Sequence, residues 1–119
     1  KPNNKELIDL ELAWKIVKHV KSNAIVVVKN NSLIGMGAGQ PNRLNSIYLA
    51  LNAAGDKSKG AVLASDAFFP YRDNVDSASV GGIRCIIQPG GSIRDEEVIE
   101  AADQAEISML FTAKRHFKH

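Results

Sequence analysis

Two spacings of apolar residues run along this chain, one typical of amphipathic helices and the other typical of buried strands. Apolar side chains three and four positions apart predict helices over residues 9–21, 42–54, 73–81 and 92–105. Short apolar runs, several of them β-branched, predict strands over residues 24–28, 33–38, 60–65, 83–88 and 108–113. The polar residues 29–32 predict a turn, so the first two strands should form a hairpin.

The order of these elements predicts the architecture. A hairpin followed by alternating helices and strands is typical of a mixed sheet with helices on both faces. Right-handed crossovers should join the later strands. The sequence therefore predicts an α/β fold, a three-layer α/β/α sandwich with a mixed sheet. Because no repeat, low-complexity segment or interdomain linker is visible, residues 1–119 are expected to form a single domain.

Composition narrows the class of protein. Of the 119 residues, 45% are hydrophobic and 24% are charged, a mixture typical of globular domains. The net charge of +2 without a basic block argues against nucleic-acid binding. No signal peptide is visible, and no apolar run approaches the roughly 20 residues that span a bilayer, so we expect no membrane partner and a cytoplasmic location. The start at Lys1, without an initiator Met, suggests a piece of a longer protein.

The single cysteine, Cys85, excludes an internal disulfide. It lies in a predicted strand, where a small buried thiol is the expected role.

The segment 65–73 carries the densest chemistry of the chain. It follows a predicted buried strand, and ligands of open α/β sheets bind at the carboxyl ends of strands. Phe68 and Phe69 are expected either to pack inward or to stack on a planar ligand. Asp66, Arg72 and Asp73 add polar groups that can orient such a ligand.

A second candidate loop surrounds three glycines. Gly35, Gly37 and Gly39 invite a dinucleotide-binding interpretation, but they follow the second arm of a hairpin, so close packing of strand on helix is favoured. Residues 40–43 begin a predicted helix, whose free N–H groups together with Arg43 suit a phosphate or carboxylate. If this loop does not face a cleft, Arg43 is instead a solvated surface residue.

Three further segments have both a structural and a functional interpretation. Residues 89–92 are either a turn with Ser92 as helix cap, with Asp95 completing a weak capping box, or a loop flanking the same cleft. Residues 115–119 place an aromatic ring between cations and are either a tail docked into a partner surface or an unstructured basic end. Asn23 can serve simply as a helix C-cap.

The order of strands and helices is that of the cytidine-deaminase-like fold. Zinc deaminases need H-x-E and P-C-x-x-C motifs, and this chain has neither. Its histidines are His19, His116 and His119, and its cysteine lies in a strand. We therefore expect no metal and no deaminase activity, but ligand binding or group transfer on a deaminase-like scaffold.

Five runs in order along the chain resemble the carboxyl-terminal part of AICAR transformylase, the formyltransferase half of a bifunctional purine-biosynthesis family that also has an IMP cyclohydrolase half. They are KSNAIVVVKN (21–30), IGMGAGQPNR (34–43), ASDAFFPYRDNVD (64–76), IIQPGGSIRDEEVIEAAD (86–103) and the terminal RHFKH (115–119). The resemblance implies transfer of a formyl group from 10-formyltetrahydrofolate to the amine of AICAR, in de novo purine biosynthesis. It also implies a preceding, similar subdomain and a homodimer with active sites at its interface.

The resemblance assigns expected contacts to individual residues. AICAR-contacting positions fall on Asn23, Arg43, Phe68 and Arg115. Folate-contacting positions fall on Leu44, Asp73, Ser92 and Ile93. The chemistry agrees, since a flat imidazole carboxamide suits a phenyl ring and its oxygens suit arginines, while apolar walls and a carboxylate suit a pterin.

One expected part is missing. The family's catalytic Lys-His dyad, in a KHANPCG-like motif, belongs to the preceding subdomain and is absent from this chain. Lys18-His19 is followed by a different sequence and is interpreted as a surface pair. The isolated chain is therefore expected to lack a general base. The alternative is a non-catalytic nucleotide-binding or dimerisation module of the same fold.

Overall fold

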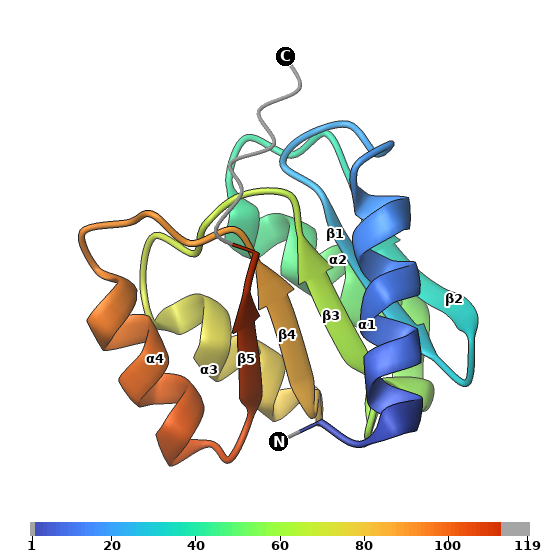
Figure 1. Cartoon of the computed structure of the whole chain (residues 1–119). Helices are drawn as coiled ribbons and strands as arrows, with labels where there is room; N and C mark the ends of the chain where they lie inside the picture. The colour runs from blue at the N-terminus through green and yellow to red at the C-terminus, as the bar shows by residue number, and fades with distance from the viewer. Residues whose placement is uncertain (1, 113–119) are drawn as a thin grey trace.

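The computed structural model describes residues 2–112, which form a five-stranded mixed sheet with helices on both faces (Figure 1). The helices are α1 (Asn4–Val17), α2 (Arg43–Ala54), the 3-10 turn η1 (Gly55–Ser58), α3 (Asp73–Val80) and α4 (Asp95–Gln104). The strands are β1 (Ile25–Lys29), β2 (Ser32–Gly37), β3 (Val62–Ser65), β4 (Cys85–Gln88) and β5 (Ser108–Phe111). The predicted order of elements is confirmed.

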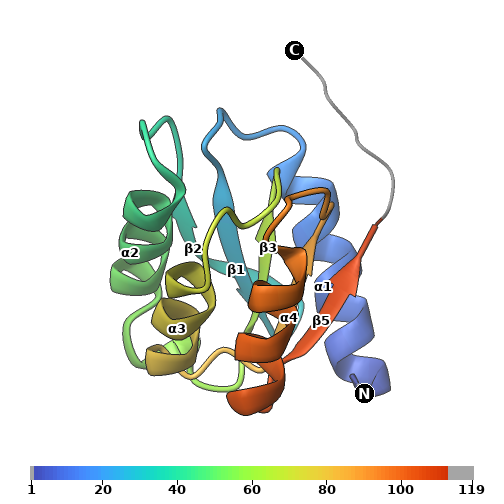
Figure 2. The same cartoon turned by 90° about the vertical axis from the view of Figure 1, so that its left-hand side faces the viewer.

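The sheet order is β2-β1-β3-β4-β5. β1 pairs antiparallel with both β2 and β3, whereas β3, β4 and β5 run parallel. α2, α3 and α4 cover one face and α1 covers the other, as Figure 2 shows. The prediction of a three-layer α/β/α sandwich with a mixed sheet is therefore confirmed. Within residues 2–112, no helix combines the length and apolar character needed to cross a membrane.

The first helix corrects the predicted boundaries. It was expected over 9–21 but begins at Asn4, because Asn3 and Glu6 form a reciprocal capping box. It ends at Val17, and Val20, which extended the helical spacing, packs against the core from the turn that follows. The apolar pattern thus marked the buried residues correctly but not the end of the helix.

The start of α4 is also corrected. Expected at Ser92, the helix begins at Asp95. Asp95 Oδ1 accepts from the backbone N–H of Ser92 at 3.1 Å, but Ser92 Oγ accepts from the N–H of Arg94 at 3.0 Å instead of capping Asp95. Only half of the expected capping box forms, so residues 89–94 remain a loop.

Each face of the sheet has its own hydrophobic cluster. Ile25 and Val27 of β1 belong to the cluster under α2–α4, while Val26 and Val28 belong to the cluster under α1. Successive strand side chains point to opposite faces, so a strand buried on both sides reads as a continuous apolar run. Large members of the first cluster are Ile47, Leu63, Phe69 and Ile86. The second cluster contains Leu10, Val17, Val62 and Cys85.

Cys85 is a buried thiol, as expected. It is 1% exposed, and burial, with a smaller contribution from the Glu6 carboxylate, raises the pKa of Cys85 to about 11. A thiol with this pKa is a poor nucleophile near neutral pH.

The glycines of β2 allow α2 to lie directly on the strand. A Cβ on Gly35 would lie 2.1 Å from the carbonyl oxygen of Ala50, and one on Gly37 would lie 2.0 Å from that of Ser46. The favoured interpretation, close packing of strand on helix, is confirmed. The contact also fixes where the first turn of α2, with Arg43, stands relative to the sheet edge.

The β1–β2 turn is held by a buried carboxylate that the sequence did not single out. Asn30 and Asn31 have φ angles of 52° and 61°, as a tight hairpin turn requires. Asp9 of α1, only 5% exposed, accepts from their backbone N–H groups at 3.1 and 2.7 Å. This contact ties the hairpin to the helix.

Candidate ligand-binding site

The predicted site residues within the described range lie in loops, or at helix starts, along one edge of the sheet. By this edge we mean the line where β2, β3 and β4 end and β1 begins. The register places Ile25, at the start of β1, opposite both Gly37 at the end of β2 and Ser65 at the end of β3. Because β4 runs parallel to β3, its end reaches the same edge. Figure 1 shows these loops together at the top of the sheet. They comprise residues 18–24, 38–42, 66–72 and 89–94.

Arg43, the first residue of α2, lies at the centre of a polar network. Its Nη1 donates to Ser65 Oγ at 3.0 Å and to Asp66 Oδ1 at 2.6 Å, and its Nη2 donates to Asn23 Oδ1 at 2.5 Å. The side chain is 8% exposed, so the alternative of a solvated surface arginine is wrong. These bonds use three of the five guanidinium N–H donors, leaving the Nε donor and one on Nη2.

Asn23 joins three segments of the site. Its Oδ1 accepts from Arg43, and its Nδ2 donates to the carbonyl oxygen of Gln40 at 2.9 Å. Its own carbonyl oxygen accepts from Ser46 Oγ at 2.5 Å. The interpretation of Asn23 as a simple helix C-cap is wrong, because α1 already ends at Val17.

Asp66 forms an ion pair with Arg43, and its side chain is 14% exposed. Its Oδ1 accepts from Arg43 Nη1 and from the backbone N–H of Ala24 at 3.2 Å. Its Oδ2 accepts from Ser22 Oγ. The carboxylate thus receives donors from the segment before β1 and from α2, and it neutralises a guanidinium that has little contact with water.

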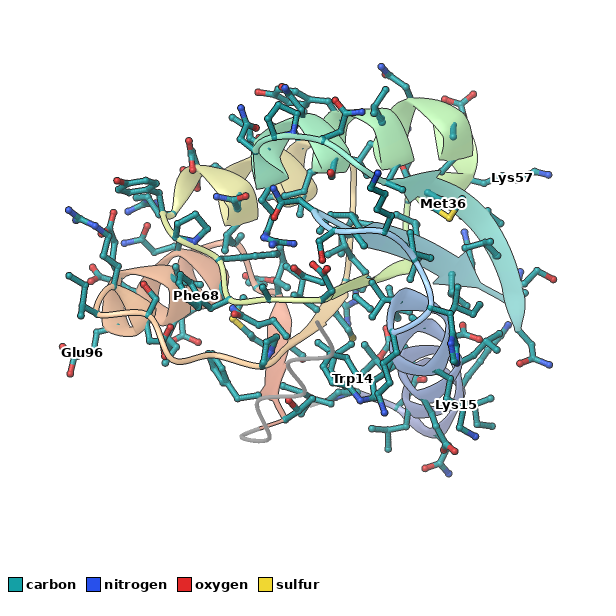
Figure 3. The ribbon with its side chains drawn as sticks, turned by 90° about the horizontal axis from the view of Figure 1, so that it is seen from above. Trp14, Lys15, Met36, Lys57, Phe68 and Glu96 are labelled. Carbon is teal, nitrogen blue, oxygen red and sulfur yellow. The ribbon has the colours of Figure 1, made fainter. Side chains whose placement is uncertain are left out.

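The two adjacent phenylalanines have different roles. Phe69 is fully buried in the core, and its backbone N–H donates to the Oε1 of buried Gln88 at 3.1 Å. Phe68 remains 37% exposed, and Figure 3, which looks down on this edge, shows it on the side of α4. The two expected alternatives, inward packing and an accessible ring, are each realised by one residue.

Asp73 begins α3 and is exposed, with its Oδ1 accepting from Asn74 Nδ2 at 3.0 Å. Asn74 is only 2% exposed, and its Oδ1 is the one buried side-chain polar atom without a hydrogen-bond partner in residues 2–112. A buried amide oxygen of this kind gains from a donor supplied by a ligand or water. Sequence reasoning missed Asn74, although it directly follows Asp73 at a helix start.

The loop between β4 and α4 lies against the loop after β3. The Arg94 guanidinium carbon lies 4.9 Å from the centroid of the Tyr71 ring, a cation–π contact. Ser92 is half-buried, whereas Ile93 is 99% exposed, so its side chain has almost no packing partner. An unpacked aliphatic side chain in a loop that contacts the exposed Tyr71 ring fits an apolar wall for a ligand.

The remaining predicted positions have different outcomes. Leu44 is half-buried in the first turn of α2, next to Arg43. Arg115 lies outside the described residues. Lys18 and His19 are both exposed, with Lys18 Nζ 5.4 Å from the centroid of the Trp14 ring, so their interpretation as a surface pair is confirmed.

Two other features bear on possible chemistry. In the described part of the chain, no three or more His, Cys, Asp or Glu side chains gather closely enough to hold a metal ion. A hollow of about 450 Å³ is lined by Pro2, Asp103 and residues 106–110, at the end of α4 and along β5. None of the predicted site residues within 2–112 lines it.

Comparison with solved structures supports the fold. The dCMP deaminase from cyanophage S-TIM5 in its apo form superposes with a TM-score of 0.61 at 18% identity, covering 94% of this chain and 99% of that one. RibD from Acinetobacter baumannii, form 2, gives a TM-score of 0.58 at 20% identity, covering 89% of this chain and 33% of that one. The prediction of a cytidine-deaminase-like fold is confirmed.

Comparison of sequences finds much nearer relatives. Residues 1–53 match the AICARFT/IMPCHase bienzyme family. The chain is 57% identical over 118 residues to the bifunctional purine biosynthesis protein PurH of Desulfitobacterium hafniense (strain DSM 10664 / DCB-2), and 58% identical to that of Bacillus subtilis (strain 168). Each match covers 99% of this chain but 23% of the relative, so the chain spans about a quarter of the length of these proteins.

Proposed function

From the premise that this chain resembles the AICAR transformylase/IMP cyclohydrolase family along nearly its whole length, we propose that it is part of a formyltransferase of purine biosynthesis. The reaction moves a formyl group from 10-formyltetrahydrofolate, a co-substrate, to the amine of AICAR. We propose that the chain corresponds to the carboxyl-terminal part of the enzyme and supplies substrate-binding residues, with no metal.

The observation that carries this proposal is the unfinished hydrogen bonding of Arg43. Three donors of a nearly buried guanidinium are fixed by the protein, and two remain. The two remaining donors, the Nε and one on Nη2, have no acceptor within residues 2–112. A guanidinium held in this way is prepared to donate to a ligand oxygen.

The charge of the network favours one kind of oxygen. Asp66 lies 2.6 Å from Arg43, so the pair carries little net charge. Its free donors therefore suit the neutral carboxamide oxygen of AICAR at least as well as a phosphate. Phe68 offers a partly exposed ring for the flat imidazole, and Arg115 is proposed as a further AICAR contact.

The folate is proposed to lie over the neighbouring loops. Ile93 and Leu44 offer apolar surface, while Asp73 and Ser92 offer polar atoms that can bond a pterin. The exposed aliphatic side chain of Ile93 gains most from such a partner, because burial of an exposed isoleucine is worth about 1.5–3 kcal/mol.

The general base is proposed to come from elsewhere in the longer protein. The Lys-His dyad of the family is absent from this sequence, and Lys18-His19 lies on the surface. A preceding subdomain and a homodimer are therefore the partners that would complete the site. The second candidate function is a non-catalytic nucleotide-binding or dimerisation module. Only the lack of the Lys-His dyad in this sequence favours it.

The test is made on the full-length protein that contains this chain. Arg43→Ala is expected to weaken AICAR binding by about 10- to 100-fold, the cost of about 1.5–3 kcal/mol for a lost charged hydrogen bond. Titration calorimetry measures the dissociation constant. Arg84→Ala is the matched control and should leave binding unchanged, since Arg84 is an exposed arginine before β4 that pairs with Glu6 of α1.

An unaltered dissociation constant for Arg43→Ala would remove this residue from the site and reject the proposal. Formyl transfer is also measured with the isolated chain, which should show no turnover because it lacks the base. Normal turnover by the isolated chain would mean that the base lies among its own residues.

A further inference from the structure

We propose that Asp66 is a positioning residue that holds Arg43 in its ligand-binding orientation. This inference rests on the proposed function, because the orientation matters only if Arg43 contacts the nucleotide. Nothing in the resemblance assigned a role to Asp66; the sequence indicated only a polar group at the end of a strand.

The bonds of Asp66 show that it is itself held rigidly. The backbone N–H of Ala24 donates to Oδ1, and Ser22 Oγ donates to Oδ2. The Asp66 backbone N–H in turn donates to the carbonyl oxygen of Ala24 at 3.3 Å. Backbone and side chain together therefore fasten Asp66 to the segment that enters β1, and this segment is part of the sheet edge.

Because Asp66 is fixed, it restricts the orientation of the Arg43 guanidinium that it binds. A free arginine side chain has about 2 kcal/mol of rotamer entropy to lose, and a buried guanidinium without a counter-charge is strongly disfavoured. Asp66 supplies the counter-charge from one side, while Ser65 and Asn23 supply neutral acceptors from others. Three fixed acceptors determine the plane of the guanidinium, and so determine where the two remaining donors point.

Asp66 is not a direct ligand contact in this arrangement. Its carboxylate already accepts from Arg43, Ala24 and Ser22, and its side chain is 14% exposed. Its effect on binding must therefore pass through Arg43, which makes the inference testable by coupling.

The experiment is a double-mutant cycle in the full-length protein, with AICAR affinity measured by calorimetry. Asp66→Asn keeps the size of the side chain but removes its charge, and should weaken binding about tenfold. In the Arg43→Ala background, Asp66→Asn should weaken binding less than twofold further, because the residue through which it acts is gone. Asp76→Asn is the matched control, since Asp76 forms an exposed pair with Arg72 on α3 at 3.3 Å.

Ser22→Ala keeps the test valid if Asp66→Asn fails to fold. Ser22 is exposed, so its substitution leaves no buried cavity while it removes one of the bonds that hold Asp66. It should weaken AICAR binding two- to threefold in the presence of Arg43 and have no effect in its absence. The folded state of every variant is checked by thermal unfolding.

The outcomes separate this inference from the proposed function. If Asp66→Asn and Arg43→Ala weaken binding independently, so that their fold-changes multiply, Asp66 does not act through Arg43 and the inference is wrong. If Arg43→Ala weakens binding while Asp66→Asn and Ser22→Ala do not, the inference alone is wrong. If Arg43→Ala has no effect, the proposed function itself is rejected.

Discussion

Two aspartates with little exposure, Asp9 and Asp66, lie near opposite ends of the strands and accept similar hydrogen bonds, but they hold different parts of the molecule. Asp9 accepts from the backbone N–H groups of Asn30 and Asn31 and fastens a hairpin turn to α1. Asp66 accepts from Arg43 as well as from the backbone of Ala24 and stands at the edge where the candidate site lies. The donors distinguish them: Asp9 binds backbone N–H groups and so holds a turn, whereas Asp66 also binds the Arg43 side chain, through which it is proposed to act on a ligand.

The strongest test of this comparison is Asp9→Ala. Loss of two charged hydrogen bonds to a strained turn should lower the free energy of unfolding by about 2–3 kcal/mol, while AICAR affinity of the folded full-length protein stays unchanged. Urea denaturation of the isolated chain measures the first quantity and calorimetry the second. Asp56→Ala, on the exposed η1 turn, is the control and should change stability by less than about 0.5 kcal/mol. A large loss of affinity in folded Asp9→Ala would erase the distinction between the two aspartates.

A second test extends the comparison to Cys85, a buried acid whose environment favours its neutral form. Burial raises the pKa of Cys85 to about 11 from 9.0, so the folded state binds the proton more tightly than the unfolded state. The stability contribution is fully present below pH 9 and is lost as the pH rises toward 11. Urea denaturation at pH 8 and pH 10, compared with Cys85→Ala, should show a steeper loss for the wild type. Equal losses would mean that the thiol titrates normally in the folded chain.

The smallest expected effect on stability is that of Ile93→Ser. Because Ile93 is 99% exposed, the change should leave the free energy of unfolding within about 0.5 kcal/mol of the wild type, yet weaken folate binding to the full-length protein several-fold. Val80→Ser is the matched control, since Val80 is 91% exposed on α3, away from the predicted folate positions. If the two substitutions affected folate binding equally, Ile93 would be an ordinary surface residue.

The sequence predicted the strands, the helices and their order because both spacings of apolar residues were present. It misplaced the start of α1 because the capping box at Asn3 and Glu6 is a short polar pattern outside the apolar spacing. It misplaced the end because Val20 is packed against the core without being helical. Periodicity reports which side chains are buried, whereas helix ends depend on single hydrogen bonds.

The candidate site was predictable only in part. Arg43 was singled out at a predicted helix start and Asn23 by resemblance, but their direct bond depends on the register of β1 with its neighbours, which no local pattern encodes. The same register brings Asp66 to Ala24. Asn74 was missed because an asparagine in the first turn of a helix is common, and its unpaired oxygen becomes visible only when the surrounding side chains are in place.

The close packing of α2 on Gly35 and Gly37 of β2 bears on how the proposed site could adjust to a ligand. The backbone of β2 packs directly against the carbonyl groups of Ala50 and Ser46, with no side chain between them. We therefore expect α2 to resist displacement along the strand. The anchor point of Arg43 is thus rigid by construction. Any adjustment that accompanies the proposed ligand binding is therefore expected in the loops that carry Phe68 and Ile93 rather than in α2.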